Sequence, residues 1–126
     1  MSLFTALDLR PVERVVRIGK EDYRLDFDHL AISHAEQIYA TQFDREPNGG
    51  IILTELLAGA MSALMAMVYG AIRSGGRAMS WETFSKSIWG MDEYDPMFDV
   101  ASDAVIEMFG SMQGDAPELG EGDEKN

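Results

Sequence analysis

The chain has 126 residues, 46% of them hydrophobic and 25% charged. This length suits one domain with its own core, and this composition excludes wholesale disorder. The 22 acidic residues outnumber the 10 basic ones, giving a net charge of −12 that argues against direct binding to nucleic acid. The absence of cysteine excludes disulfides, thiol catalysis and zinc–thiolate sites.

Residues 1–11 form a mildly apolar N-terminal arm that lacks the basic and apolar segments of a signal peptide, so we expect a cytoplasmic protein. A β-hairpin follows. Residues 12–18 are rich in β-branched side chains, residues 19–22 suit a turn, and residues 23–28 alternate between apolar and polar. This alternation predicts one apolar face made of Tyr23, Leu25 and Phe27, which must pack on the rest of the domain.

Asp28 is a favourable N-cap for a helix predicted over residues 29–43. The longest apolar stretch, residues 50–73, has breakers on both sides and no proline, which predicts a single buried central helix. On a helical wheel its bulky face, directed at the core, comprises Leu53, Leu57, Met61, Leu64, Met65, Val68 and Ile72. A second face, small enough at its centre to admit another helix, comprises Ile52, Leu56, Gly59, Ala63, Ala66 and Gly70.

Ser80 is the expected N-cap of a helix over residues 81–89 that stops at Gly90. Asp95 and Pro96 are the expected cap and first residue of a helix that runs to about Met112. Residues 114–126 are acidic and glycine-rich, which is typical of a disordered tail. The predicted fold class is therefore mainly α: about four helices around a long central helix, an N-terminal hairpin within a domain of residues 12–113, and a flexible acidic tail.

The sequence contains no arrangement that indicates catalysis. It has no phosphate-binding loop and no nucleophile elbow, and Asp92, Glu93 and Asp95 lie in a predicted turn without a basic partner. Asp26, Asp28 and His29 are more typical of a strand end, an N-cap and an exposed histidine than of a metal site. We therefore expect a non-enzyme with no catalytic, cofactor-binding or metal-binding residues.

Protein binding is the more natural role, because methionine and aromatic side chains are numerous. Methionine suits adaptable binding surfaces, although such residues also fill cores. The residues that we assign to partner binding are Trp81, Phe84, Trp89, Met97, Phe98, Met108, Phe109 and Met112. In the tail, the acidic residues that we single out as candidate site residues are Glu118, Glu121, Asp123 and Glu124.

Four stretches together resemble a known family. They are the hairpin sequence VRIGKEDYRLDFD at residues 16–28, a following helix with Ala31 and Glu36, the helix end VYGAI at residues 68–72, and MSWE at residues 79–82. With the acidic tail, this order resembles the tail assembly chaperones of long-tailed bacteriophages over about residues 12–110. The arm at residues 1–10 and the pair Trp81 and Trp89 depart from the family pattern.

The resemblance implies a non-catalytic chaperone in the host bacterial cytoplasm that binds the tape measure protein and helps to recruit tail tube subunits. It also implies a longer product made by frameshifting within the tail, for which the codons of Glu124, Lys125 and Asn126 allow a slippery heptamer. We further expect a homo-oligomer. Three alternatives stay open: a generic helical adaptor or virion component, an acidic inhibitor that mimics DNA, and a small membrane protein, since residues 56–72 carry no charge.

Overall fold

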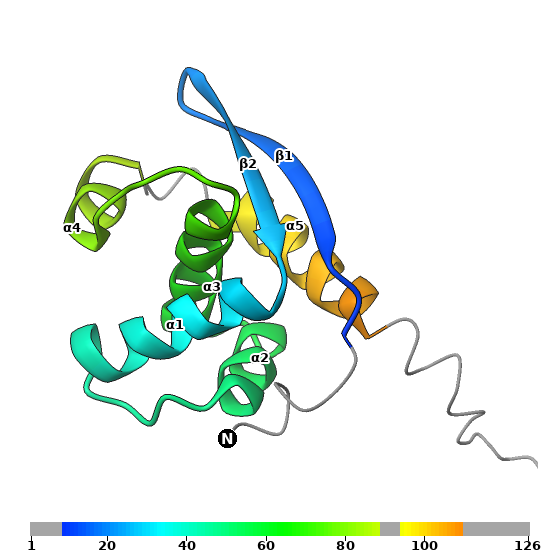
Figure 1. Ribbon diagram of the computed structural model, residues 1–126, viewed down its shortest axis with the longest axis vertical. Helices are drawn as coiled ribbons and strands as arrows, with labels where there is room; N and C mark the ends of the chain where they lie inside the picture. The colour runs from blue at the N-terminus through cyan, green and yellow to red at the C-terminus, as the bar shows by residue number, and fades with distance from the viewer. Residues whose placement is uncertain (1–8, 89–93, 110–126) are drawn as a thin grey trace, which may run out of the picture.

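The computed structural model describes residues 9–88 and 94–109 (Figure 1). In chain order its elements are β1 (Val12–Ile18), β2 (Glu21–Phe27), α1 (His29–Gln42), α2 (Gly49–Leu57), α3 (Met61–Ser74), α4 (Trp81–Thr83), the π-helical turn η2 (Phe84–Ile88) and α5 (Tyr94–Met108). The predicted fold class, mainly α with an N-terminal β-hairpin, is confirmed. The described residues leave out residues 1–8 of the arm, residues 89–93 with Trp89 and Gly90, and residues 110–126 with Met112 and the whole tail.

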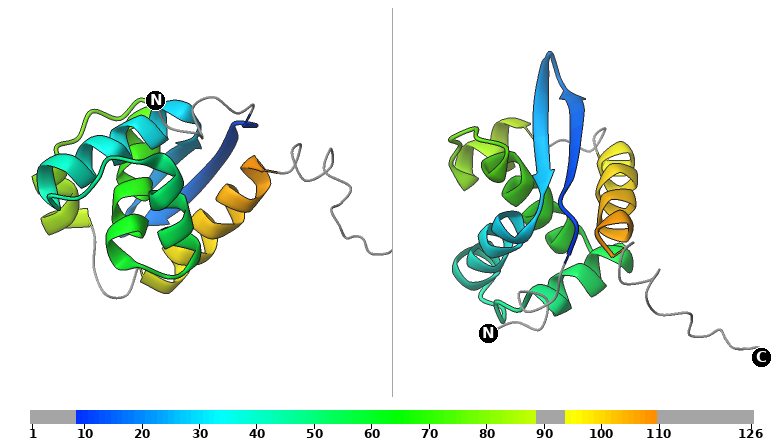
Figure 2. Two further views of the ribbon diagram at one scale, coloured as in Figure 1. Left: turned by 90° about the horizontal axis from the view of Figure 1, so that it is seen from below. Right: turned by 45° about the vertical axis from the view of Figure 1, so that its right-hand side comes forward.

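The hairpin forms as its sequence pattern predicts. β1 and β2 pair antiparallel with Val12 opposite Phe27 and Ile18 opposite Glu21. Gly19, with a φ of 66°, is the first of the two turn residues, which is the position that a type II′ turn gives to glycine. β2 lies against α3 and β1 against α5, as the right-hand view of Figure 2 shows. The predicted apolar face is buried, since Tyr23, Leu25 and Phe27 are at most 4% exposed.

The predicted single helix over residues 50–73 is wrong, because the chain breaks after Leu57. Gly59 adopts a φ of 93°, in the left-handed region that glycine favours. Its N–H donates to the Leu56 carbonyl at 2.9 Å, and the N–H of Ala60 donates to the Glu55 carbonyl at 2.9 Å. These two bonds are the Schellman pattern that ends a helix. The result is two helices, α2 and α3, bent by 116° relative to each other.

α3 is the central helix, and its small face admits α1 as predicted. A Cβ atom added to Gly70 would lie 2.3 Å from the carbonyl oxygen of Ala31 in α1. Ala31, Ala35, Ala63 and Ala66 are all fully buried. The backbones of α1 and α3 therefore meet at Gly70, where only a hydrogen atom fits. Gly59, predicted to lie on the same small face, instead has nothing within 4 Å of its Cβ position.

Asp28 joins the start of α1 to the end of α3. Its Oδ1 accepts from the N–H of Ala31 at 2.9 Å, which confirms the predicted N-cap. The hydroxyl of Ser74 donates to the same carboxylate, at 2.7 Å from Oδ1 and 2.9 Å from Oδ2. One carboxylate thus fixes the hairpin–helix junction against α3. Gly75, the residue after α3, also lies close to the Arg24 carbonyl of β2.

The last helices differ from prediction at their ends. The Ser80 cap is confirmed, since its Oγ accepts from the N–H of Thr83 at 3.1 Å. α5 begins at Tyr94, which places Asp95 in the first turn rather than at the cap. A carboxylate there still favours the positive end of the helix dipole. α5 ends at Met108, short of Met112, where the N–H of Phe109 bonds three residues back to Ile106.

Among the described helices, none is long and apolar enough by itself to cross a membrane. α2 and α3 meet the length and composition criteria only when taken together, across their bend of 116°.

Gly70→Ala tests the close crossing of α1 and α3. In an unconstrained helix this change stabilises by about 0.5–1 kcal/mol. Here the added methyl group would clash with the Ala31 carbonyl, so we expect the free energy of unfolding to fall by about 1–3 kcal/mol in urea denaturation. A gain in stability, as helix propensity alone predicts, would contradict this crossing.

Candidate protein-binding surface

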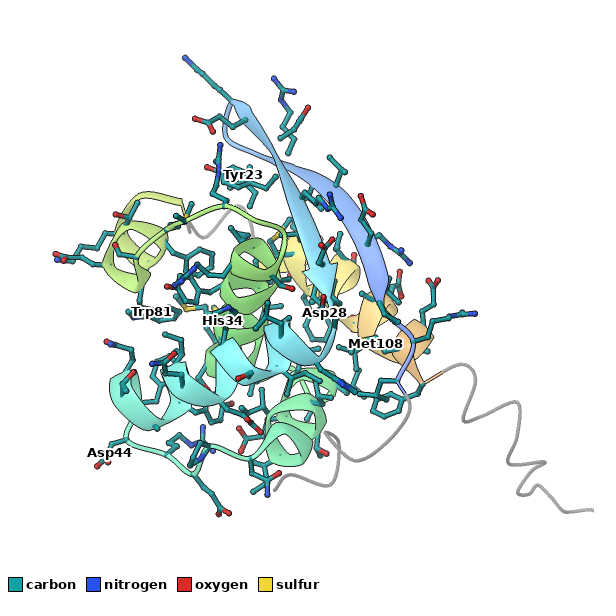
Figure 3. All side chains as sticks on the ribbon, in the orientation of Figure 1. Tyr23, Asp28, His34, Asp44, Trp81 and Met108 are labelled. Carbon is teal, nitrogen blue, oxygen red and sulfur yellow. The ribbon has the colours of Figure 1, made fainter. Side chains whose placement is uncertain are left out.

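The residues assigned to partner binding do not form one surface. Figure 3 shows Trp81 and Met108 on opposite sides of the molecule. Phe84, Met97 and Met108 are at most 3% exposed and belong to the core, so their assignment to a partner surface is corrected. The reason is that α5 turns its methionine side toward the core and that Phe84 of η2 packs against Tyr69 of α3, with ring centroids 5.5 Å apart. Trp81, Phe98 and Phe109 are partly buried and pack against this core. The remaining candidate site residues lie outside the described residues; they are Trp89, Met112, Glu118, Glu121, Asp123 and Glu124.

Trp81 belongs to an aromatic cluster that joins α1, α3 and α4. Its ring centroid lies 5.4 Å from that of Tyr69, 5.6 Å from that of Phe84 and 5.6 Å from that of Phe43. The hydroxyl of Tyr69 donates to the Met79 carbonyl at 2.8 Å. Trp81 meets Phe43 and Tyr69 edge-to-face, an arrangement that stabilises packing, and its ring plane is tilted by 35° relative to that of Phe84. Trp81 of α4 and Phe84 of η2, predicted to bind a partner, therefore hold α4 and η2 to the domain.

A cleft of about 490 Å³ adjoins this cluster. It is lined by Gln42, Trp81, Glu82, Ser85 and Lys86. Lys86 and Glu82 already pair with each other at 3.1 Å across one helical turn. The cleft therefore offers an aromatic edge and a paired charge, which is not an arrangement that activates a nucleophile.

The described residues place few groups where they could carry chemistry. No group of three or more histidine, aspartate and glutamate side chains within residues 9–88 and 94–109 could hold a metal ion. Burial lowers the pKa of His34, and the charge of Arg73 lowers it further while Asp28 opposes the change. The Cβ atom of His34 lies beside Gly70 at the crossing of α1 and α3. His34 thus lies at the edge of the core, where its surroundings disfavour the protonated form.

The exposed side of α2 is apolar, which sets it apart from an ordinary surface helix. Ile51 is 39% exposed and Leu57 44% exposed, and Thr54 and Ala58 lie between them on the same side. At about 100° per residue these four positions span a third of the helix circumference, opposite the buried Ile52, Leu53 and Leu56. Surface helices normally place polar residues on the solvent side. We call Ile51, Thr54, Leu57 and Ala58, with Met61 just beyond the bend, the α2 face.

The α2 face has no charged side chain, although the protein is strongly acidic. Between Asn48 and Ile72 the only charged residue is Glu55. Its carboxylate is hydrogen-bonded to two side chains of the same chain. Its Oε1 accepts from the Tyr39 hydroxyl at 2.7 Å, and its Oε2 accepts from Arg45 at 2.5 Å. Charges gather elsewhere, on the hairpin and α5: Arg17 pairs with Asp22, Arg24 with Glu13 and Asp26, and Glu107 with Arg10 and Arg14.

α2 is fixed at both ends, so the α2 face is presented on a preformed helix. At its start, Glu36 of α1 accepts from the N–H of Gly49 at 2.8 Å, and the Asn48 side chain accepts from the N–H of Ile51 at 3.2 Å. Further along, Glu55 joins Tyr39 of α1 to Arg45 of the connecting loop. Arg45 in turn donates to Ser62 of α3 at 3.3 Å. A surface that is ordered before binding loses less entropy when a partner docks.

Sequence reasoning missed the α2 face because it treated residues 50–73 as one helix. In that helix Leu57 and Met61 belong to the bulky face directed at the core, yet they are 44% and 38% exposed. The break at Gly59 rotates α2 away from the continuation of α3 and exposes both side chains. The Ala58–Gly59–Ala60 step was the available signal, because glycine just past a helix end commonly terminates it.

Tyr39→Phe tests the network that holds α2. Burial, and then the hydrogen bond to Glu55, raise the pKa of Tyr39 to about 12. Because the folded state favours the neutral phenol, its contribution is complete below the unfolded pKa of 10.0 and is lost as the pH rises toward 12. We expect Tyr39→Phe to cost about 1 kcal/mol at pH 7.

The pH profile tests whether the folded state favours the neutral Tyr39 phenol. Urea denaturation between pH 7 and pH 11 should show the parent losing stability above pH 10 more steeply than Tyr39→Phe. Parallel profiles for the two proteins would contradict the raised pKa of Tyr39, to which burial and the hydrogen bond to Glu55 both contribute.

Comparison with known proteins gives no relative from which a role for the α2 face might be taken. No protein family, curated protein or solved structure matches this chain.

Proposed function

We propose that this protein is a non-catalytic assembly chaperone that binds an amphipathic helix of a larger protein through the α2 face. Following the resemblance to phage tail assembly chaperones, the larger protein is the tape measure protein, and tail tube subunits are recruited to the resulting complex. The observation that carries the proposal is the exposed and uncharged α2 face, whose large apolar side chains are Ile51 and Leu57 of α2 and Met61 at the start of α3.

The size and chemistry of the α2 face fit one side of a helix. α2 has nine residues and is therefore about 13 Å long, which matches two to three turns of a partner helix. Such a helix docks through apolar residues at positions i, i+3, i+4 and i+7. A contact this small is weak by itself. Many copies bound along one long helical protein, and touching one another, would still coat it by multivalent binding.

The acidic character of the rest of the protein suits the same role. A net charge of −12 keeps a coated complex soluble. Charges around an apolar contact also select partners, because they attract helices with basic flanks and repel acidic ones. We expect the partner helix to carry lysine or arginine beside its apolar stripe.

Co-expression with the tape measure protein, the long helical protein expected from a neighbouring gene, tests the proposal. The parent should keep that protein in the soluble fraction. Leu57→Glu places a charge within the contact and should weaken binding by about 30-fold, the effect of a hot-spot residue worth ~2 kcal/mol. Ile106→Glu on α5 is the matched control, since Ile106 is 49% exposed against 44% for Leu57, and it should bind like the parent.

Two outcomes would overturn the proposal. The first is equal rescue of solubility by the parent and Leu57→Glu, with both proteins folded by circular dichroism. The second is binding to lipid vesicles that depends on Leu57 while the helical protein is ignored, which would assign the α2 face to a membrane surface.

A further inference from the structure

Methionine side chains differ sharply in exposure across the described part of the chain. Three belong to the core and are at most 3% exposed: Met67, Met97 and Met108. Met65 and Met79 are partly buried and pack against that core. Met61 is 38% exposed. Among the methionines that the structure describes, the thioether of Met61 is therefore the one that a dissolved reagent reaches most readily.

Met61 lies at a point of the α2 face where its chemistry matters. It is the first residue of α3, after the break at Gly59, and it completes the apolar set formed by Ile51 and Leu57. Its unbranched thioether is apolar and adapts to the shape of a partner. The α2 face carries no charge and, apart from the Thr54 hydroxyl, no polar side-chain group. A polar group introduced at Met61 would therefore change the character of the contact.

We propose that Met61 is a site of reversible oxidation by hydrogen peroxide, and that its sulfoxide closes the α2 face to an apolar partner helix. The sulfur lone pair attacks one peroxide oxygen, so that an S–O bond forms as the O–O bond breaks. The oxygen that stays on sulfur gives its proton to the departing hydroxide, which leaves as water. Sulfur loses two electrons and the peroxide gains two. The product, methionine sulfoxide, is polar.

The change is reversible and is confined to the surface. A methionine sulfoxide reductase restores the thioether with two electrons from a dithiol, which becomes a disulfide while the oxygen leaves as water. A sulfoxide in the core would bury a polar oxygen without a partner, whereas the oxygen on Met61 meets water. The bonds that hold this region join Arg45 to Glu55 and Ser62 and do not involve the thioether. The fold should therefore survive oxidation.

Oxidation rates measured in the full chain without a partner test the site itself. The protein is treated with dilute hydrogen peroxide, and each methionine is followed by peptide mass spectrometry. Met61 should form sulfoxide at least about ten-fold faster than the buried Met67, Met97 and Met108, because susceptibility follows exposure. In urea the four rates should become similar. Equal rates in the folded protein would overturn the proposal.

Binding before and after peroxide treatment tests the switch, which rests on the proposed function. Binding of the treated parent to the tape measure protein should weaken about ten-fold, and methionine sulfoxide reductase with dithiothreitol should restore it. Met61→Leu keeps an apolar side chain of similar size and removes the sulfur. Measured against its own untreated baseline, this variant should not respond to peroxide.

Two outcomes would overturn the switch. The first is an equal loss of binding in the parent and in Met61→Leu, which would assign the effect to another methionine, including Met1, Met91 and Met112 outside the described residues. The second is unchanged binding by a parent whose Met61 is fully oxidised. An untreated parent that does not bind would overturn the proposed function and the switch with it, but not the selective oxidation of Met61.

Discussion

The close approach of α1 to α3 at Gly70 is the contact on which the rest of the structure depends. With α1 held against α3, both ends of α1 reach other elements: Asp28 bonds to Ser74 at the end of α3, and Tyr39 bonds to Glu55 in α2. Glu36, between them, accepts from the first N–H of α2. A side chain larger than hydrogen at Gly70 would separate the helices and strain all of these bonds together.

The break at Gly59 decides how the most apolar part of the chain is divided between core and surface. α3 turns most of its side chains inward, including Leu64, Met67, Val68 and Ile72, all fully buried. α2, bent away by 116°, buries Ile52, Leu53 and Leu56 and leaves Ile51 and Leu57 exposed. A straight helix would bury or expose these residues along one continuous stripe. The bend is therefore what presents an apolar surface on a protein that is acidic elsewhere.

Local sequence signals predicted the parts of the fold that local interactions determine. The hairpin follows from the alternation of Tyr23, Leu25 and Phe27, and the caps at Asp28 and Ser80 follow from the preference of their side chains for free N–H groups. The break at Gly59 was missed because its neighbours are all good helix formers, although glycine is also the residue that most often follows a helix end; the backbone bonds to Leu56 and Glu55 show that the helix does end there.

The candidate site was harder to predict than the fold for a related reason. Composition identified methionine and aromatic residues as partner-binding, yet Phe84, Met97 and Met108 are buried. Whether a large apolar side chain serves the core or a partner depends on which way its helix faces, and one sequence does not contain that information. The α2 face became visible only from exposed fractions and from the position of Glu55, whose charge is directed toward Tyr39 and Arg45.

The most direct test of this account is hydrogen–deuterium exchange of the protein with and without the soluble helical partner. If the α2 face is the binding surface, amide exchange should slow in Gly49–Leu57 and across the bend to Met61, while exchange in the hairpin stays the same. Slower exchange confined to the outer side of α5 or to the hairpin, with α2 unchanged, would contradict the account.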